Sequence, residues 1–130
     1  MRKLSGINIQ WPISELILQG KKTIETRTYP VPQKYLNQDM IMIETPGKSG
    51  RFKSRMRCIL KFTECFQYKS RQDFYNDIDK HCVSKDSPWK WDPTKPKWGW
   101  IVEVVEVFDK PLQLKKRPGI KFSTDIEIPD

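Results

Sequence analysis

The segment from residue 51 to residue 62 strongly constrains the fold, because cationic and apolar side chains alternate along it. Four cations occupy every second position: Arg51, Lys53, Arg55 and Arg57. Apolar residues stand between and beyond them: Phe52, Met56, Cys58, Leu60 and Phe62. Side chains two residues apart lie on the same face of a β-strand. The pattern therefore predicts a strand over 51–64 with one cationic face and one buried face.

The rest of the chain predicts further short strands and two helices. Strands are expected over 3–9, 22–28, 39–45, 98–108 and within 119–128, with Lys110-Pro111 ending the one that begins at residue 98. Helices are expected from Pro12 to Leu18 and over 71–80, the second with Ser70 and Asp73 at capping-box spacing. Strands outnumber helices and short turns join them. Antiparallel pairing in a small barrel with two helices is therefore expected.

The length of 130 residues fits one domain spanning 1–130, and 37% hydrophobic residues are enough to form its core. No apolar run approaches the roughly 18 residues that a membrane span requires. Arg2 and Lys3 are not followed by the apolar segment of a secretory signal. A cytoplasmic protein without a membrane partner is expected.

The positive charge is concentrated in one half of the chain. The net charge is +8, and residues 1–65 carry 12 basic residues against 5 acidic ones, whereas residues 66–130 carry 12 against 11. A local cationic surface predicts an anionic partner, and the row at 51–57 suits the phosphates of a nucleic acid. The alternative is that these charges only keep the protein soluble.

Metal and nucleophile chemistry find little support in the sequence. The chain has three cysteines without Cys-x-x-Cys spacing and one histidine, His81, so no zinc site, other metal site or cofactor is expected. Pro46-Gly47-Lys48-Ser49 lacks the earlier glycine of a phosphate-binding P-loop, because position 42 is Met42. His81 and Cys82 are sequence neighbours, whose side chains usually point apart, so a Cys–His nucleophile is not favoured.

The segment Gly20 to Arg27 holds the most informative polar residues. On a strand, Thr23, Glu25 and Arg27 would share one face, while Lys22 would lie on the other. An acid and a base two residues apart can line a binding site, or they can form a surface ion pair.

The run from Trp11 to Arg27 also resembles the signature of the ASCH domain family, in which a short helix ends in a Gly-x-Lys-Thr turn and a strand of the form Ile-Glu-x-Arg follows. Pro46-Gly47 and Trp98-Gly99-Trp100-Ile101-Val102 fit later strands of the family. The resemblance covers most of the chain in order. It implies an α+β, PUA-like small mixed or antiparallel β-barrel flanked by two or three short helices.

The resemblance also implies a function, because the PUA-like superfamily includes RNA-binding modules and readers of modified bases. A ligand cleft is expected beside the Gly-Lys-Thr turn. Lys22 and Thr23 would border it with Lys21 beside them, and Glu25 and Arg27 would line it. The implied partner is RNA, another single-stranded nucleic acid or a nucleoside-like ligand.

A second function is implied by small bacterial relatives that are amidohydrolases acting on acetylated cytidine. They use a lysine at the position of Lys22, a threonine at the position of Glu25 and a glutamate from a later strand. Lys22 and Glu25 would then be the catalytic residues, with Glu64 and Glu103 both open as the later glutamate. The chain differs from these relatives at Glu25, which has no hydroxyl group.

Four tryptophans fall close together in the second half, interleaved with lysines: Trp89, Trp91, Trp98 and Trp100. Trp100 begins a predicted strand beside a glycine and is expected in the core. Trp89 and Trp91 belong to the polar, proline-interrupted stretch 80–97, where packing explains a tryptophan less well and stacking on nucleobases is an alternative role for at least one of them. The sequence thus favours a nucleic-acid-binding module, with deacylation of an acylated nucleoside such as N4-acetylcytidine as the alternative.

Overall fold

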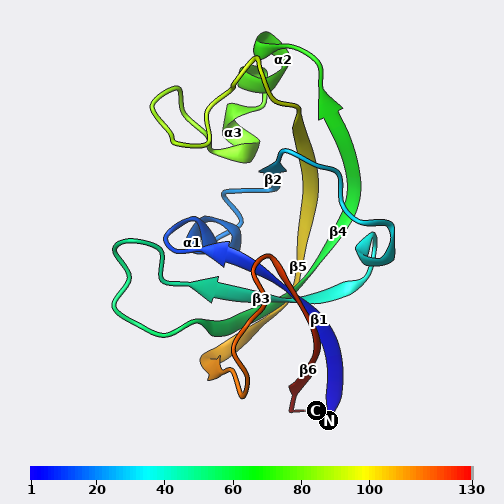
Figure 1. Cartoon of the computed structure of the whole chain (residues 1–130), viewed down its shortest axis with the longest axis vertical. Helices are drawn as coiled ribbons and strands as arrows, with labels where there is room; N and C mark the ends of the chain where they lie inside the picture. The colour runs from blue at the N-terminus through cyan, green and yellow to red at the C-terminus, as the bar shows by residue number, and fades with distance from the viewer. Residues whose placement is uncertain (130) are drawn as a thin grey trace.

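The computed structural model describes residues 1–129, and its framework is one mixed sheet of six strands with three short α-helices around it (Figure 1). The elements in chain order are β1 (Arg2–Gln10), α1 (Ile13–Leu18), β2 (Ile24–Arg27), the 3-10 helix η1 (Gln33–Tyr35), β3 (Asp39–Thr45), β4 (Arg55–Tyr68), α2 (Arg71–Asn76), α3 (Ile78–His81), β5 (Lys97–Gln113) and β6 (Phe122–Ile128). The strands lie in the order β2-β5-β4-β3-β1-β6. No helix within these residues is long and apolar enough to cross a membrane.

The pairing of the strands is mixed rather than entirely antiparallel. β3, β4 and β5 form an antiparallel meander, but β1 and β3 run parallel. A parallel pair needs a long crossover, which residues 11–38 supply with α1, β2 and η1. β6 pairs antiparallel with β1 and places Ile128 opposite Arg2 (Figure 1). The outermost strands, β2 and β6, do not pair with each other, so the sheet is open and the predicted barrel is not confirmed.

Apolar side chains are buried on both faces of the sheet. Met40 and Met42 of β3 belong to one cluster with Trp100, whereas Ile41 and Ile43 belong to a second cluster. Trp100 is fully buried, as predicted, and its indole N–H donates to the Tyr29 carbonyl at 3.0 Å. Aromatic rings pack against Gly99, where a Cβ would come within 2.7 Å of the Phe66 ring. The glycine therefore allows these rings to pack closely against the backbone beside Trp100.

The basic strand begins later than the alternation predicts. β3 ends at Thr45, and the β3–β4 pairing starts where Glu44 lies opposite Arg55. The residues from 46 to 54 therefore form the connection between the two strands, and Gly50 N–H donates to the Pro46 carbonyl within it. The prediction of a strand from residue 51 was wrong, and β4 instead continues to Tyr68.

The end of β5 and the extent of the second predicted helix also differ from the predictions. β5 continues past Lys110-Pro111 to Gln113, because its register against β4 shifts between Val107 and Leu112, and a bulge accommodates a proline that a regular ladder would exclude. The helix expected over 71–80 divides at Asp77, whose carboxylate accepts from the Tyr68 hydroxyl at 2.7 Å. Its predicted cap is confirmed, since Ser70 Oγ accepts from the backbone of Asp73.

Candidate functional site

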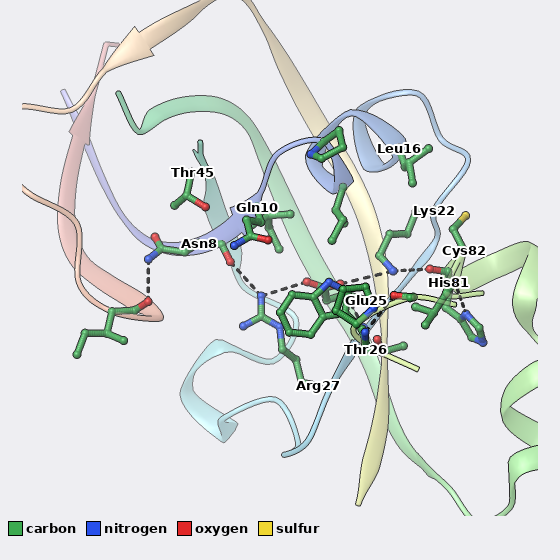
Figure 2. Close-up of a pocket in the computed structure, with 18 residues that line it drawn as sticks. Asn8, Gln10, Leu16, Lys22, Glu25, Thr26, Arg27, Thr45, His81 and Cys82 are labelled. Atoms are coloured by element: carbon green, nitrogen blue, oxygen red, sulfur yellow. Dashed lines mark hydrogen bonds and ion pairs between the residues drawn. The ribbon is translucent and has the colours of Figure 1, made fainter. Parts of the chain in front are cut away.

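A cavity of about 680 Å³ opens between the end of β1, helix α1, strand β2 and the segment that follows α3 (Figure 2). Three charged side chains from the Gly20–Arg27 region line it: Lys22, Glu25 and Arg27. Apolar side chains from β1, α1 and the turn between them line the same cavity: Ile9, Pro12, Ile13 and Leu16. The cavity therefore combines a few charged groups with a largely apolar wall, as is typical of small-molecule sites.

Glu25 lies between the two cations of the cavity. Its Oε2 is 3.1 Å from Nη2 of Arg27, and its Oε1 is 3.6 Å from Nζ of Lys22. The backbone N–H of Thr26 donates to Oε1 at 3.2 Å. Glu25 is buried, and these partners compensate for its desolvation. Two positive charges and one negative charge leave the cavity with a positive excess.

Lys22 is almost completely buried, with 4% of its surface exposed, and its ammonium donates to the His81 carbonyl. Burial lowers the pKa of Lys22, and the nearby Glu25 carboxylate only partly opposes this effect. The predicted placement of Lys22 on the face opposite Glu25 was wrong. β2 begins at Ile24, so Lys22 precedes the strand and does not follow its alternation.

Arg27 is fixed by contacts on several sides. Its Nη2 donates to the Asn8 carbonyl at 3.0 Å, its Nη1 donates to the Tyr29 hydroxyl at 3.2 Å, and its guanidinium lies 5.5 Å from the centre of the Trp100 ring. Burial alone would lower the pKa of Arg27, but Glu25 and Tyr29 outweigh it and raise that pKa. Arg27 is therefore a permanent cation of the site.

His81 contributes its carbonyl, not its ring, to the site. Nδ1 accepts from the Val83 backbone at 2.9 Å, and Nε2 lies 2.6 Å from the Phe74 carbonyl, to which it donates. Burial lowers the pKa of this imidazole, so the neutral ring is favoured. Both ring nitrogens are occupied, and the neighbouring Cys82 Sγ is directed at the Lys21 carbonyl instead. The pair does not form a nucleophile and base.

The other residues of the Gly20–Arg27 prediction lie outside the cavity. Lys21 and Thr23 are exposed and do not line it. Thr23 acts through its backbone, which donates to the Lys80 carbonyl at 2.8 Å and accepts from Val102 at 2.9 Å. Glu64 and Glu103 are also exposed. Glu25 is therefore the one carboxylate among the described residues that line the cavity.

The four cations of the predicted phosphate row do not share one face. Arg51 and Lys53 are exposed in the connection before β4. Arg55 and Arg57 instead bond to the buried Glu44, at 2.7 Å and 2.8 Å. Two of the four alternating cations, Arg55 and Arg57, therefore already have a carboxylate partner within the protein.

The two tryptophans of the 80–97 stretch lie in different surroundings. Trp89 is 49% exposed and lines the cavity, and its carbonyl accepts from Nζ of Lys97 at 2.8 Å. Trp91 packs against Phe74 with ring centres 5.8 Å apart, and its backbone N–H donates to the Tyr75 hydroxyl. Of the two, only Trp89 is placed to stack on a ligand.

Matched substitutions should separate these two positions. Trp91→Ala is expected to lower the free energy of unfolding by about 1–3 kcal/mol, because its packing against Phe74 is lost. Trp89→Ala is expected to stay within about 0.5 kcal/mol of the parent chain, because the side chain is half exposed. Urea denaturation followed by circular dichroism measures both values. A larger loss for Trp89→Ala would contradict the assignment.

Asn8 is the site residue that sequence reasoning missed. It lines the cavity, its carbonyl accepts from Arg27, and its side chain donates to the carbonyls of Gly119 and Ile120. The one sequence signal for it is an amide that stands between two isoleucines, Ile7 and Ile9. Within residues 1–129, no three His, Cys, Asp or Glu side chains are arranged to hold a metal ion.

Comparisons with known proteins identify similar structures but no similar sequence. No protein-family model matches the chain. No curated protein matches it in sequence. A crystal structure of a tyrosine-to-phenylalanine mutant of the ASCH protein from Zymomonas mobilis superposes with a TM-score of 0.68 at 15% identity, covering 95% of this chain and 90% of that chain. A structure of ASCH from the same organism gives 0.68 at 14% identity, over 92% of this chain and 85% of that chain.

A serine-to-alanine mutant of the same protein gives a TM-score of 0.61 at 13% identity, covering 92% of this chain and 86% of that chain. Identities this low establish the arrangement of the backbone and nothing about the chemistry of the cavity. The chain has an ASCH-like fold.

Proposed function

We propose that this protein binds RNA or another single-stranded nucleic acid and takes one nucleobase, or a free nucleoside, into the cavity lined by Lys22, Glu25 and Arg27. The observation that carries the proposal is the buried Lys22–Glu25–Arg27 group in a cavity of about 680 Å³ with an exposed tryptophan among its lining residues. The three free cysteines suit the reducing cytoplasm, where we place the protein.

The chemistry of the cavity suits a nucleobase. An ammonium has three N–H donors and a guanidinium has five, so Lys22 and Arg27 retain donors beyond their contacts with the protein. Glu25 supplies acceptor oxygens between them. The polar edge of a base presents both donors and acceptors to such groups. Its flat face can stack on Trp89, which contributes about 1–3 kcal/mol per base.

The wider surface and the fold support the same proposal. The net charge of +8 favours an anionic partner. The cavity lies beside the Gly20–Arg27 segment, where the resemblance to the ASCH family implies a ligand cleft. A modified base is one form that the ligand can take.

Binding measurements test this function directly. Anisotropy of a fluorescein-labelled single-stranded RNA of random sequence should show affinity that falls with salt, with a log–log slope of roughly −3 to −4 for about four to six phosphates. Trp89→Ala should weaken binding by about tenfold. Nucleoside analysis of the RNA retained by the protein identifies any selected base. An affinity that does not depend on salt would exclude a nucleic-acid backbone contact.

A second function is favoured by one feature of the cavity. The Lys22 amine has a pKa lowered by burial and lies 3.6 Å from the Glu25 carboxylate, and a lysine base requires such a lowered pKa. This function is hydrolysis of an acylated nucleoside, in which water adds to the amide carbonyl and the C–N bond breaks. Release of acetate and cytidine from N4-acetylcytidine, lost in Lys22→Met, would establish it. Absence of turnover across acylated nucleosides would reject it.

A further inference from the structure

The connection between β5 and β6, residues 114–121, lies between two cavities of similar size. Ile120 lines the cavity described above and is 95% exposed, although it is apolar. Its neighbour Gly119 lines a second cavity of about 670 Å³. This single segment of chain therefore contributes to the lining of both cavities.

The second cavity is cationic on the side formed by this connection. Its lining includes four basic residues: Lys3, Lys115, Lys116 and Arg117. Lys115 lies 3.7 Å from the Glu127 carboxylate. Lys116 and Arg117 are exposed, and within residues 1–129 neither forms an ion pair. Two adjacent cations are thus available to an external anion.

Asn8 holds the connection in place beside the candidate site. Its Nδ2 donates to the carbonyls of Gly119 and Ile120 at 2.8 Å and 3.0 Å, and its backbone N–H donates to the Lys121 carbonyl at 2.9 Å. Arg27 donates to the carbonyl of the same asparagine, so one residue joins the charged group of the cavity to the connection (Figure 2). The distance between the two surfaces is therefore fixed by direct contacts.

Lys116 and Arg117 of this connection differ from the cations of β4 in whether they already have a carboxylate partner. Arg55 and Arg57 already bond to Glu44, and bringing a phosphate to them would require competition with a buried carboxylate. Lys116 and Arg117 form no ion pair with a carboxylate of residues 1–129, and exposed lysine and arginine side chains commonly contact phosphates.

We propose that residues 115–121 form a phosphate-binding subsite, in which Lys116 and Arg117 bind the phosphodiester backbone of nucleotides adjacent to the base held in the first cavity. This inference rests on the proposed function. It identifies the connection between β5 and β6 as the surface that extends a single-nucleotide cavity into a site for a polymer. Asn8 is a positioning residue for this surface, because it contacts the backbone of the connection.

The salt dependence of RNA binding tests the subsite. Lys116→Gln combined with Arg117→Gln should weaken binding of the labelled random-sequence RNA roughly tenfold at low salt and make the log–log slope shallower by about 1.4, since single strands contribute about 0.7 per phosphate. Two matched controls apply. Lys116→Arg with Arg117→Lys preserves both charges, and Lys69→Gln with Lys110→Gln removes two exposed charges outside both cavities. Both controls should retain the parent slope.

The outcomes separate the subsite from the function on which it rests. Trp89→Ala should lower affinity without changing the slope, because stacking does not release counterions. If the double glutamine variant keeps the parent slope while Trp89→Ala weakens binding, the subsite is wrong and the cavity stands. If the RNA binds and Trp89→Ala and Lys22→Met have no effect, the cavity is wrong. A parent protein that binds neither single-stranded RNA nor single-stranded DNA overturns the subsite and the nucleic-acid binding on which it rests.

Discussion

Glu44→Gln is expected to lower the free energy of unfolding by about 3 kcal/mol, the low end of the range for breaking a buried ion pair. Glu44 is fully buried, and it accepts from Ser14 at 2.5 Å, Arg55 at 2.7 Å and Arg57 at 2.8 Å. A glutamine has the same size but no charge to offset two guanidinium groups. Arg57 keeps its contact with Glu15 at 2.7 Å, so the loss is incomplete. Urea denaturation at neutral pH measures it.

The pH dependence provides a second test of the same cluster. Burial alone would raise the pKa of Glu44, but the hydrogen bonds from Ser14, Arg55 and Arg57 outweigh it and hold that pKa below its usual 4.5. The folded chain therefore releases this proton more readily than the unfolded chain. The contribution is complete above about pH 4.5 and is lost as the pH falls through the folded value.

The stability difference between the parent chain and Glu44→Gln should accordingly shrink as the pH is lowered below 4.5. Glu103→Gln is the matched control, because Glu103 is exposed and its replacement should change stability by less than about 0.5 kcal/mol. A Glu44→Gln variant as stable as the parent chain at neutral pH would show that the cluster does not stabilise the fold.

The Glu44 cluster also shows what the sequence could not reveal. The alternation over 51–57 correctly indicates a strand with cations on it, because period-two patterns are local. The partner of those cations is Glu44 on the preceding strand, and a period-two pattern within one strand does not show that the register of β3 against β4 brings the three residues together. Glu44 ends an apolar run, where it reads as a surface residue rather than a buried one.

Local features of the chain were predicted well where one segment determines them. β3 spans Asp39–Thr45 as expected, and Ser70 caps the N-terminus of α2. The open sheet and the parallel pairing of β1 with β3 depend on contacts between distant segments, and the antiparallel barrel expected from the number of strands and short turns does not account for them.

The candidate site was predicted in part for the same reason. The structure brings Lys22, Glu25 and Arg27 together in one cavity, and their function stays a prediction. The side on which Lys22 lies depends on where β2 begins. β2 begins at Ile24, two residues later than predicted, so Lys22 precedes the strand and lies beside Glu25. Asn8 belongs to the site because it contacts Arg27 and the connection after β5. These residues are far from Asn8 in the sequence, so no local pattern predicts the contacts.

Lys22→Met is expected to weaken RNA binding by about 10- to 100-fold while the free energy of unfolding stays within about 1 kcal/mol of the parent value. A lost charge-assisted hydrogen bond to a ligand costs about 1.5–3 kcal/mol, which gives that loss of affinity. Folding is affected less, because the buried ammonium is itself costly and Glu25 keeps its contact with Arg27 at 3.1 Å. Methionine fills a similar volume without a charge.

Lys21→Met is the matched comparison, since it removes the neighbouring charge from an exposed position outside the cavity. It should reduce affinity by no more than about threefold, as expected for one distant charge under screening. Equal losses for the two variants would mean that net charge, and not the cavity, determines binding. A large loss of stability in Lys22→Met would assign Lys22 to the fold instead of the site.

Alkaline pH adds a readout that belongs to Lys22 alone. Burial holds its pKa in the folded chain below the usual 10.5, so between these two values the unfolded chain binds more protons than the folded chain. The free energy of unfolding of the parent chain should therefore rise with pH relative to that of Lys22→Met across this interval. Lys21→Met should follow the parent chain, because this variant retains the buried Lys22 ammonium. A parent chain and a Lys22→Met variant with parallel stability curves would indicate that the ammonium is solvated, and a solvated ammonium could not act as the buried donor that the proposed site requires.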